Sequence, residues 1–205
     1  RSTLSSSSAA SDVYKRQDVE VYLQRSAGML GLEGNPELPN FTMPSAGSLN
    51  QPRAMCAADF DGDGLVDVAT ANFGDDSLTV FWQQAEGTLS RFTDTKLDGG
   101  AGTAGPVSIA CGDLNRDGYV DLASANALDD SVAVHWSRGD GTFAVPPLVI
   151  DTGARSLPLC VLVTDVDRDG QDDIVSANSD NDTISVFLQP DSGTIGDLPA
   201  VVLDS

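Results

Sequence analysis

Acidic residues recur at alternate positions in three short stretches of the chain. The first stretch runs from Asp59 to Asp67 and reads Asp-Phe-Asp-Gly-Asp-Gly-Leu-Val-Asp. The other two begin at Asp113 and Asp165 and repeat this arrangement. Carboxylate and carboxamide oxygens are hard donors that suit calcium, and a glycine at the sixth position permits the tight turn that directs them to one point. Each stretch is therefore predicted to be a loop that binds one calcium ion.

The predicted ligands are the side chains at loop positions 1, 3, 5 and 9 and the backbone carbonyl at position 7. They approach the six to eight oxygens that calcium takes at about 2.3 to 2.6 Å, whereas magnesium resists dehydration and demands octahedral geometry. The three sets are Asp59, Asp61, Asp63, Leu65 and Asp67; Asp113, Asn115, Asp117, Tyr119 and Asp121; and Asp165, Asp167, Asp169, Gln171 and Asp173.

Two other interpretations of the loops are an acidic glycine turn without metal and an EF-hand. Repetition in register disfavours the first. The EF-hand uses a bidentate glutamate at loop position 12, where this chain has Thr70, Ser124 and Ser176. The flanking residues are also typical of strands rather than helices.

The loops are part of a longer internal repeat. The steps between loop starts are 54 residues, from Asp59 to Asp113, and 52 residues, from Asp113 to Asp165. Other residues keep the same register: a proline seven before the loop, an Ala-Asn pair, a hydroxyl residue and a Gly-Thr pair. These are Pro52, Pro106 and Pro158; Asn72, Asn126 and Asn178; Ser77, Ser131 and Thr183; and Gly87-Thr88, Gly141-Thr142 and Gly193-Thr194.

Each repeat is predicted to form four short strands. The first strand follows the proline and is apolar on both faces, so it is expected to be fully covered. The acidic loop leads to a second strand that alternates and ends at the asparagine, and an Asx and hydroxyl turn leads to the third. Four-stranded units at this period indicate blades of a β-propeller.

The predicted fold is therefore all-β, a partial β-propeller of about three and a half blades with calcium loops. Residues 18–205 form this domain, and residues 18–51 match the end of one blade. The three further blades are residues 52–105, 106–157 and 158–205. Fewer than four blades rarely close a propeller, so a fragment is expected, with the remaining blades of the same propeller as partners.

Residues 1–17 fall outside this pattern. They are rich in serine, show no strand alternation and lack the apolar region of a signal peptide. They resemble translated sequencing-adapter read-through, as found in metagenomic genes, and a natural disordered leader is the alternative.

Composition excludes some classes of partner. The chain has 31 acidic and 11 basic residues and a formal charge of −20, which repels nucleic acids and anionic membrane surfaces. No apolar run has the length of about 18 residues that a membrane-spanning helix needs. Neither nucleic-acid binding nor membrane insertion is expected.

Candidate catalytic residues are few. The single histidine, His135, aligns with Phe81 and Phe187 and is expected to be a packed ring, so no Ser-His-Asp or Cys-His site can be assembled. Trp82 and Trp136 occupy equivalent positions, which favours packing between blades over a sugar platform. We predict no catalytic and no cofactor-binding residue.

The cysteines are three in number, at Cys56, Cys111 and Cys160, without metal-ligand or redox spacing. They lie in apolar runs and are expected to be buried free thiols. A disulfide between two of them is the alternative.

Across residues 18–205 the sequence resembles the FG-GAP and VCBS-type repeats of integrin-α-like β-propellers. The resemblance is carried by the Asp-x-Asp/Asn-x-Asp-Gly-x-x-Asp loops, the Ala-Asn pairs and the Gly-Thr turn, although Glu86 and Ser192 replace the acid seen at Asp140. It implies a calcium loop between the first two strands of each blade. It also implies an extracellular or cell-surface, bacterial setting and a role in adhesion.

Two functions follow as hypotheses. The first is a secreted or cell-surface, calcium-stabilised scaffold that binds a protein or glycan through its variable loops and is not an enzyme. The alternative is part of a catalytic propeller such as a polysaccharide lyase or hydrolase, because some propellers build active sites on one face.

Overall fold

The computed structural model describes residues 20–21, 24–25, 29–30, 41–42, 50–85, 89, 95–98, 101–191, 194–196 and 200–204. The chain divides into two compact units, Arg1–Asn50 and Gln51–Ser205. Residues 1–17, interpreted above as a leader, lie outside the described residues, as do Gly87-Thr88 and Gly193 of the Gly-Thr turns.

The described part of the first unit consists of four two-residue strands. They are β1 (Glu20–Val21), β2 (Gln24–Arg25), β3 (Met29–Leu30) and β4 (Phe41–Thr42). β1 pairs with β4 and β2 with β3, both antiparallel.

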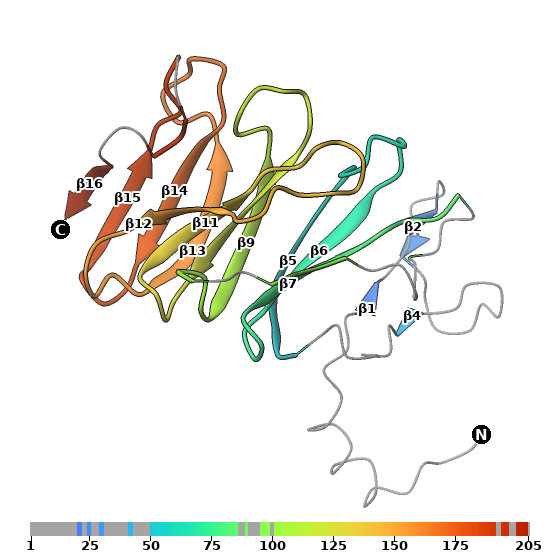
Figure 1. Ribbon diagram of the computed structural model, residues 1–205, viewed down its shortest axis with the longest axis horizontal. Coiled ribbons are helices and arrows are strands. Elements are labelled where there is room, and N and C mark those ends of the chain that lie inside the picture. The colour runs from blue at the N-terminus through green and yellow to red at the C-terminus, as the bar shows by residue number, and fades with distance from the viewer. Residues whose placement is uncertain are drawn as a thin grey trace, which may run out of the picture. The chain divides into compact units, whose positions relative to one another are not determined.

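The described part of the second unit contains three four-stranded antiparallel sheets, each following chain order (Figure 1). The first has β5 (Pro52–Ala58), β6 (Asp67–Asn72), β7 (Ser77–Phe81) and β8 (Thr95–Asp98). The second has β9 (Pro106–Gly112), β10 (Asp121–Asn126), β11 (Ser131–His135) and β12 (Leu148–Asp151). The third has β13 (Pro158–Thr164), β14 (Asp173–Asn178), β15 (Thr183–Phe187) and β16 (Val201–Asp204). The all-β prediction of four-stranded repeat units is confirmed.

Each sheet begins at the repeated proline, and the pairing of its first two strands is irregular at that point. The register shifts between Pro52 and Ala54, between Pro158 and Cys160, and opposite Pro106 at Asn126. Proline has no N–H to give to a ladder and is tolerated at the first residue of a strand or at a bulge. The proline therefore marks the start of every unit.

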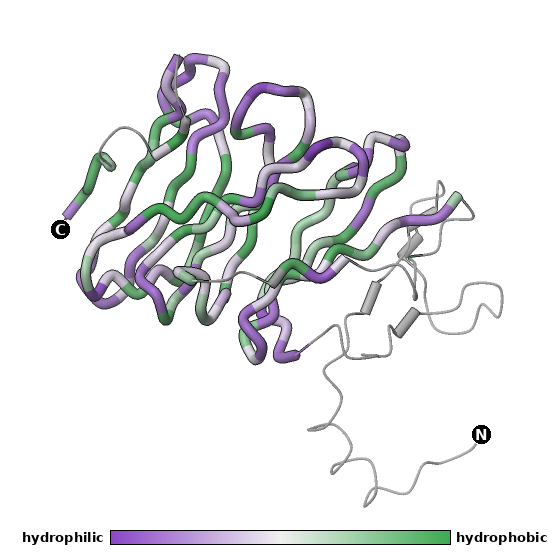
Figure 2. The backbone as a smooth tube through the Cα atoms, in the orientation of Figure 1, coloured by the Kyte–Doolittle hydropathy of each residue, from purple (hydrophilic) through white to green (hydrophobic). Residues whose placement is uncertain are grey.

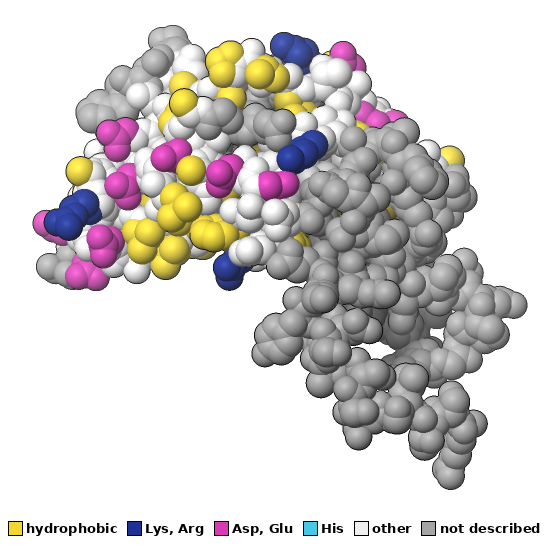
Figure 3. Space-filling model, turned by 60° about the horizontal axis from the view of Figure 1, so that its bottom comes forward, with side chains coloured by type: hydrophobic (Ala, Val, Ile, Leu, Met, Phe, Trp, Pro, Cys, Tyr) yellow, Lys and Arg dark blue, Asp and Glu magenta, His cyan; other side chains and the backbone are white. Residues whose placement is uncertain are grey.

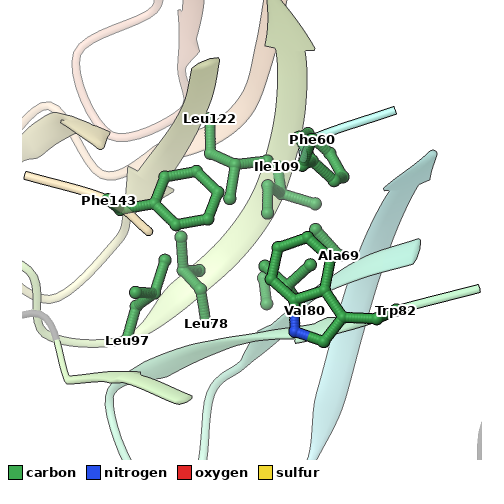
Figure 4. Close-up of a cluster of buried hydrophobic side chains, with 10 residues drawn as sticks. Phe60, Ala69, Leu78, Val80, Trp82, Leu97, Ile109, Leu122 and Phe143 are labelled. Atoms are coloured by element: carbon green, nitrogen blue, oxygen red, sulfur yellow. The ribbon is translucent and has the colours of Figure 1, made fainter. Parts of the chain in front are cut away.

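Two hydrophobic cores lie between successive sheets rather than within one. In the first core, Leu78 and Val80 of β7 face Ile109 of β9 and Leu122 of β10 (Figure 4). Phe143 joins this core and lies 6.3 Å from Phe60, centroid to centroid. The second core joins β10 and β11 to β13, β14 and β15 in the same way. Stacking of neighbouring units is what buries their apolar faces, as expected for a repeat protein.

Burial of the strands differs from the sequence prediction. The first strands, expected to be fully covered, are only partly so: β5 alternates half-buried and exposed residues, and four of the seven residues of β13 are exposed. The second strands, expected to alternate, are buried on both faces in β6 and β10, completely so in β10, whereas Ala177 of β14 is exposed. The small side chains of Ala123 and Ala125 let the neighbouring sheet pack closely over β10, so the contact with that sheet decides burial more than strand hydropathy does.

The tube coloured by hydropathy shows hydrophilic loops connecting hydrophobic strands (Figure 2). The described part of one face carries acidic side chains with hydrophobic ones between them (Figure 3). The described residues include no helix with the length and hydrophobicity that a membrane crossing needs.

Candidate metal centres

The three acidic loops occupy equivalent places in the fold. Each joins the first strand of a sheet to the second, and the three lie at the same edge of their sheets, at the top of Figure 1. The sixth residue of every loop is a glycine with positive φ: Gly64 (85°), Gly118 (88°) and Gly170 (87°). A Cβ at these positions would meet no atom within 4 Å, so the backbone conformation, not lack of space, requires glycine there.

The aspartate at position 1 organises each loop. One oxygen of its carboxylate accepts a hydrogen bond from the N–H of the position-6 glycine. The distances are 2.8 Å from Gly64 to Asp59, 2.9 Å from Gly118 to Asp113 and 3.0 Å from Gly170 to Asp165. The position-1 aspartate is therefore held in the interior of the turn, with its second oxygen also bonded to a loop N–H.

The aspartate at position 9 has a second role that sequence analysis missed. Asp121 accepts one hydrogen bond from the Leu114 N–H at 3.0 Å and another from the Ser137 N–H at 2.8 Å. Asp67 and Asp173 make the same pair of bonds, to Phe60 and Gln83 and to Val166 and Gln189. All three carboxylates are buried. Each ties the loop to the chain just after the third strand, and the only sequence signal is a polar residue 24 positions after the loop start.

Three carboxylates come together in the first and third loops. Ligand atoms of Asp59, Asp61 and Asp67 lie within 4.8 Å of one another, and so do those of Asp165, Asp167 and Asp173. The second loop has Asp113 and Asp121 at the corresponding positions and the amide of Asn115 between them. Two of the three predicted centres therefore have a cluster of acids that could hold a metal ion, and the second has the same scaffold with one charge fewer.

The position-5 side chains are outside these clusters. Asp63, Asp117 and Asp169 each accept a hydrogen bond from the N–H two residues later, at 2.8, 2.9 and 2.8 Å. Their role as ligands stays a prediction, as does that of the position-7 carbonyls of Leu65, Tyr119 and Gln171.

Burial and like charges raise the pKa values of several loop acids. Burial raises the pKa of Asp121 to about 7, with Asp117 and Asp113 adding to the effect. Burial also raises the pKa values of Asp61, Asp67 and Asp167, and neighbouring carboxylates contribute in each case. A bound cation offsets both causes, so this donor set fits a divalent cation with a preference for oxygen ligands.

The loops also contact the following repeat. The Ser137 hydroxyl donates to the Phe60 carbonyl at 3.2 Å, and Arg116 donates to the Gln171 side chain at 3.1 Å. Order in one loop is therefore coupled to its neighbour.

The repeated asparagine and hydroxyl residues form a buried network rather than a metal site. Asn126 accepts from Ser124 at 3.0 Å and donates to Ser131 at 3.2 Å. Asn72 and Asn178 make the corresponding bonds in the other two sheets. The position-12 residues Thr70, Ser124 and Ser176 belong to this network, so they are strand residues and not ligands.

The residues weighed for catalysis lie in packed surroundings. His135 is buried, and burial lowers its pKa to about 4. Trp82 belongs to the core between the first two sheets and Trp136 packs against the second core. These observations agree with packing roles.

The cysteines are free, but they are not all buried as expected. Cys56 and Cys111 are half-buried and their thiols interact across adjacent sheets, whereas Cys160 is exposed. Cys160 lies on a face of β13 that no described sheet covers, which explains the difference.

The family comparison covers this same region. The model described as FG-GAP-like repeat matches residues 59–124 and 113–176, which together span 118 of the 205 residues. No curated protein matches the chain. Both matches begin at the first aspartate of an acidic loop and end within the second strand of the next repeat. The chain belongs to the family of FG-GAP-like repeat proteins.

Proposed function

We propose that this chain is a calcium-stabilised binding scaffold that acts outside the cell or at the cell surface and catalyses no reaction. The observation that carries the proposal is the convergence of three carboxylates in the first loop and in the third, on a shared hydrogen-bonded frame. The second loop is the third calcium site of the proposal, because it keeps the same frame.

Calcium suits these loops better than other ions. All donors in these loops are oxygens, whereas zinc sites favour histidine nitrogen and cysteine sulfur as ligands. The loops are open at position 5, where the carboxylates are exposed, so a flexible coordination number is available, as calcium prefers. Calcium-binding modules outside cells work with dissociation constants of about 10⁻⁴ to 10⁻³ M, which suits the proposed location.

The scaffold role is supported by where variation lies in the repeat. The strands and acidic loops keep their register, while the connections between sheets differ in length and sequence. Variable loops on a constant frame are common binding sites. A protein or glycan ligand carried by these connections is the proposed partner.

The test is thermal unfolding of the whole chain, first with excess chelator and then with millimolar calcium or magnesium. A site with a dissociation constant of about 10⁻⁴ M is held at 100 times this constant in about 10 mM calcium, which adds about 2.7 kcal/mol, so calcium should raise the midpoint and magnesium should raise it less. Asp61→Ala and Asp167→Ala remove one acid from each triad and should reduce the calcium effect. Asp180→Ala, an exposed acid outside the loops, is the matched control.

Equal midpoints in chelator and calcium for a folded chain would contradict the calcium proposal. Lyase or hydrolase activity of the purified chain on a polysaccharide would independently contradict the proposal that the chain catalyses no reaction.

A further inference from the structure

Two of the three cysteines meet where the first sheet stacks on the second. Cys56 lies on β5 and Cys111 on β9, and both side chains pack against the first core. The Cys56 thiol forms a hydrogen bond with the Cys111 sulfur. Cys111 Sγ also lies 3.9 Å from the carbonyl oxygen of Ala57, the residue that follows Cys56. The two sulfur atoms are therefore neighbours although they belong to different repeats.

The same place in the next stacking contact holds apolar side chains. Cys56 stands three residues before its acidic loop, and Cys111 stands two residues before its own. In the contact between the second and third sheets these positions are Ala110 and Val163, which pack against the second core. Stacking of the sheets therefore needs no sulfur at this place, and the cysteine pair is a feature of the first contact alone among the described sheets.

The two thiols differ in their readiness to react. Both cysteines are only half-buried, so the pair is not sealed from solvent. The hydrogen bond from Cys56 lowers the pKa of Cys111, and the same bond raises the pKa of Cys56, with burial adding to the effect. Cys111 is therefore the thiolate of the pair. A thiolate is the nucleophile in disulfide exchange, and Cys56 lies where a second thiol is needed to complete that exchange.

We propose that Cys56 and Cys111 form a disulfide that covalently joins the first repeat to the second, with a low-molecular-weight disulfide as the oxidant. The Cys111 thiolate attacks one sulfur of the oxidant, and the other sulfur leaves as a thiolate and takes up the proton that Cys111 has lost. Cys56 then loses its proton and attacks the Cys111 sulfur of this mixed disulfide, which releases the second thiol of the oxidant. Two cysteine thiols are oxidised, and one disulfide is reduced to two thiols.

The cross-link would close a covalent ring around the first acidic loop. The ring contains residues 57–110, which include the whole stretch from Asp59 to Asp67. A disulfide that fits the native geometry stabilises the fold mainly because it restricts the unfolded chain, and the effect grows with the length of the ring. The proposal needs no metal ion and no binding partner, so it can fail or succeed independently of the proposed function.

The test incubates the whole chain with reduced and oxidised glutathione in millimolar calcium, once folded and once in urea. The three cysteines lie in separate tryptic peptides, so mass spectrometry of a non-reduced digest identifies every disulfide. We expect the link between Cys56 and Cys111 to be the main product in the folded chain. Cys160, which is exposed, should carry glutathione instead.

The link should also depend on the fold. Its equilibrium constant should be at least about tenfold larger in the folded chain than in urea. By linkage, the oxidised chain should then be more stable than the reduced chain by at least about 1.4 kcal/mol, which urea unfolding of the two forms measures.

Matched variants use residues that the chain itself has at equivalent positions. Cys56→Ala gives the first repeat the alanine of the second, and Cys111→Ala gives the second repeat the alanine of the first, so neither should disturb the stacking. Each should abolish the link and make the unfolding midpoint insensitive to the oxidant. Cys160→Ser installs the serine of the second repeat and should leave both the link and its effect on the midpoint unchanged.

Free thiols at Cys56 and Cys111 under conditions that fully modify Cys160 would overturn the proposal. Glutathione on both cysteines without a link between them would overturn it as well, and so would a link of either one to Cys160. A link that forms only in urea, or that lowers the unfolding midpoint, would show that the folded structure does not favour the disulfide.

Discussion

The second repeat shares one backbone frame with its two neighbours but departs from both at a metal-loop position and at a buried position in the third strand. Asn115 stands where the first and third loops have Asp61 and Asp167, and His135 stands where the neighbours have Phe81 and Phe187. In all three loops the position-1 aspartate accepts a hydrogen bond from the position-6 N–H, and the position-9 aspartate accepts one from the position-2 N–H. The comparison teaches that these bonds form the loop, while the position-3 residue changes the charge of the loop, so the calcium proposal predicts a different affinity for the second loop.

The largest expected effect tests the shared frame. Asp121→Ala leaves the N–H groups of Leu114 and Ser137 buried without acceptors, and each such group costs about 1 to 3 kcal/mol. We expect a loss of about 4 kcal/mol in free energy of unfolding, measured with urea in the presence of chelator. Asp117→Ala in the same loop removes only exposed hydrogen bonds, from the Tyr119 N–H and the Asn115 amide, and should cost less than about 1 kcal/mol. Equal losses would show that the frame is not organised by position 9.

The next effect concerns the pH dependence of stability, which should distinguish the second repeat from its neighbours because only the second repeat has His135. The folded-state pKa of His135 is about 4 and the usual value is 6.5, so the folded state binds fewer protons than the unfolded state between these limits. Stability from this residue is complete above pH 6.5 and is lost as pH falls to 4, by about 3 kcal/mol.

His135→Phe installs the residue of the neighbouring repeats and should remove this loss. The comparison is the difference in unfolding free energy between variant and parent at pH 7 and at pH 4.5. The two proteins should diverge as pH falls, and parallel pH profiles would refute a buried neutral imidazole.

A third effect concerns the charge of the loops. In calcium at 100 times the dissociation constant, Asp61→Ala and Asp167→Ala should each lose up to about 2.7 kcal/mol of calcium-dependent stabilisation. Asn115→Ala should lose less, because it removes a neutral ligand. The readout is the difference between midpoints in calcium and in chelator. An equal loss for all three would mean that charge at position 3 does not distinguish the loops.

The smallest effect is expected for a substitution that gives the second loop the same three acids as its neighbours. Asn115→Asp adds a third carboxylate near Asp113 and Asp121, so calcium affinity of this loop should rise about tenfold, which is about 1.4 kcal/mol. Stability in chelator should fall because the added charge is repelled. Calorimetric titration measures the first change and urea unfolding the second, and an unchanged affinity would argue against metal binding in this loop.

Much of the fold was predictable because the repeat fixes it. The spacing of Asp59, Asp113 and Asp165, with prolines and asparagines in register, predicted four-stranded units with the loop after the first strand. Sequence also predicted the buried ring at His135. These features depend on local residue types whose meaning is reinforced by repetition.

What sequence did not predict depends on contacts between sheets. The strand β10 was expected to alternate between buried and exposed residues, but all of its residues are buried. Cys160 was expected to be buried but is exposed. Burial at these positions is set by whether a neighbouring sheet is present, which strand hydropathy does not encode. The same holds for Asp121 and Asp130, whose partners include backbone N–H groups 16 and 27 residues away, respectively.

The most direct test of the calcium account is a calorimetric titration of the whole chelator-treated chain with calcium, with magnesium as the comparison. We predict binding of three calcium ions with magnesium much weaker, and a stoichiometry that falls by one in Asp61→Ala and again by one in the double variant with Asp167→Ala. No calcium binding by the folded chain, or equal binding in the double variant and the parent, would contradict the assignment of these loops as calcium sites.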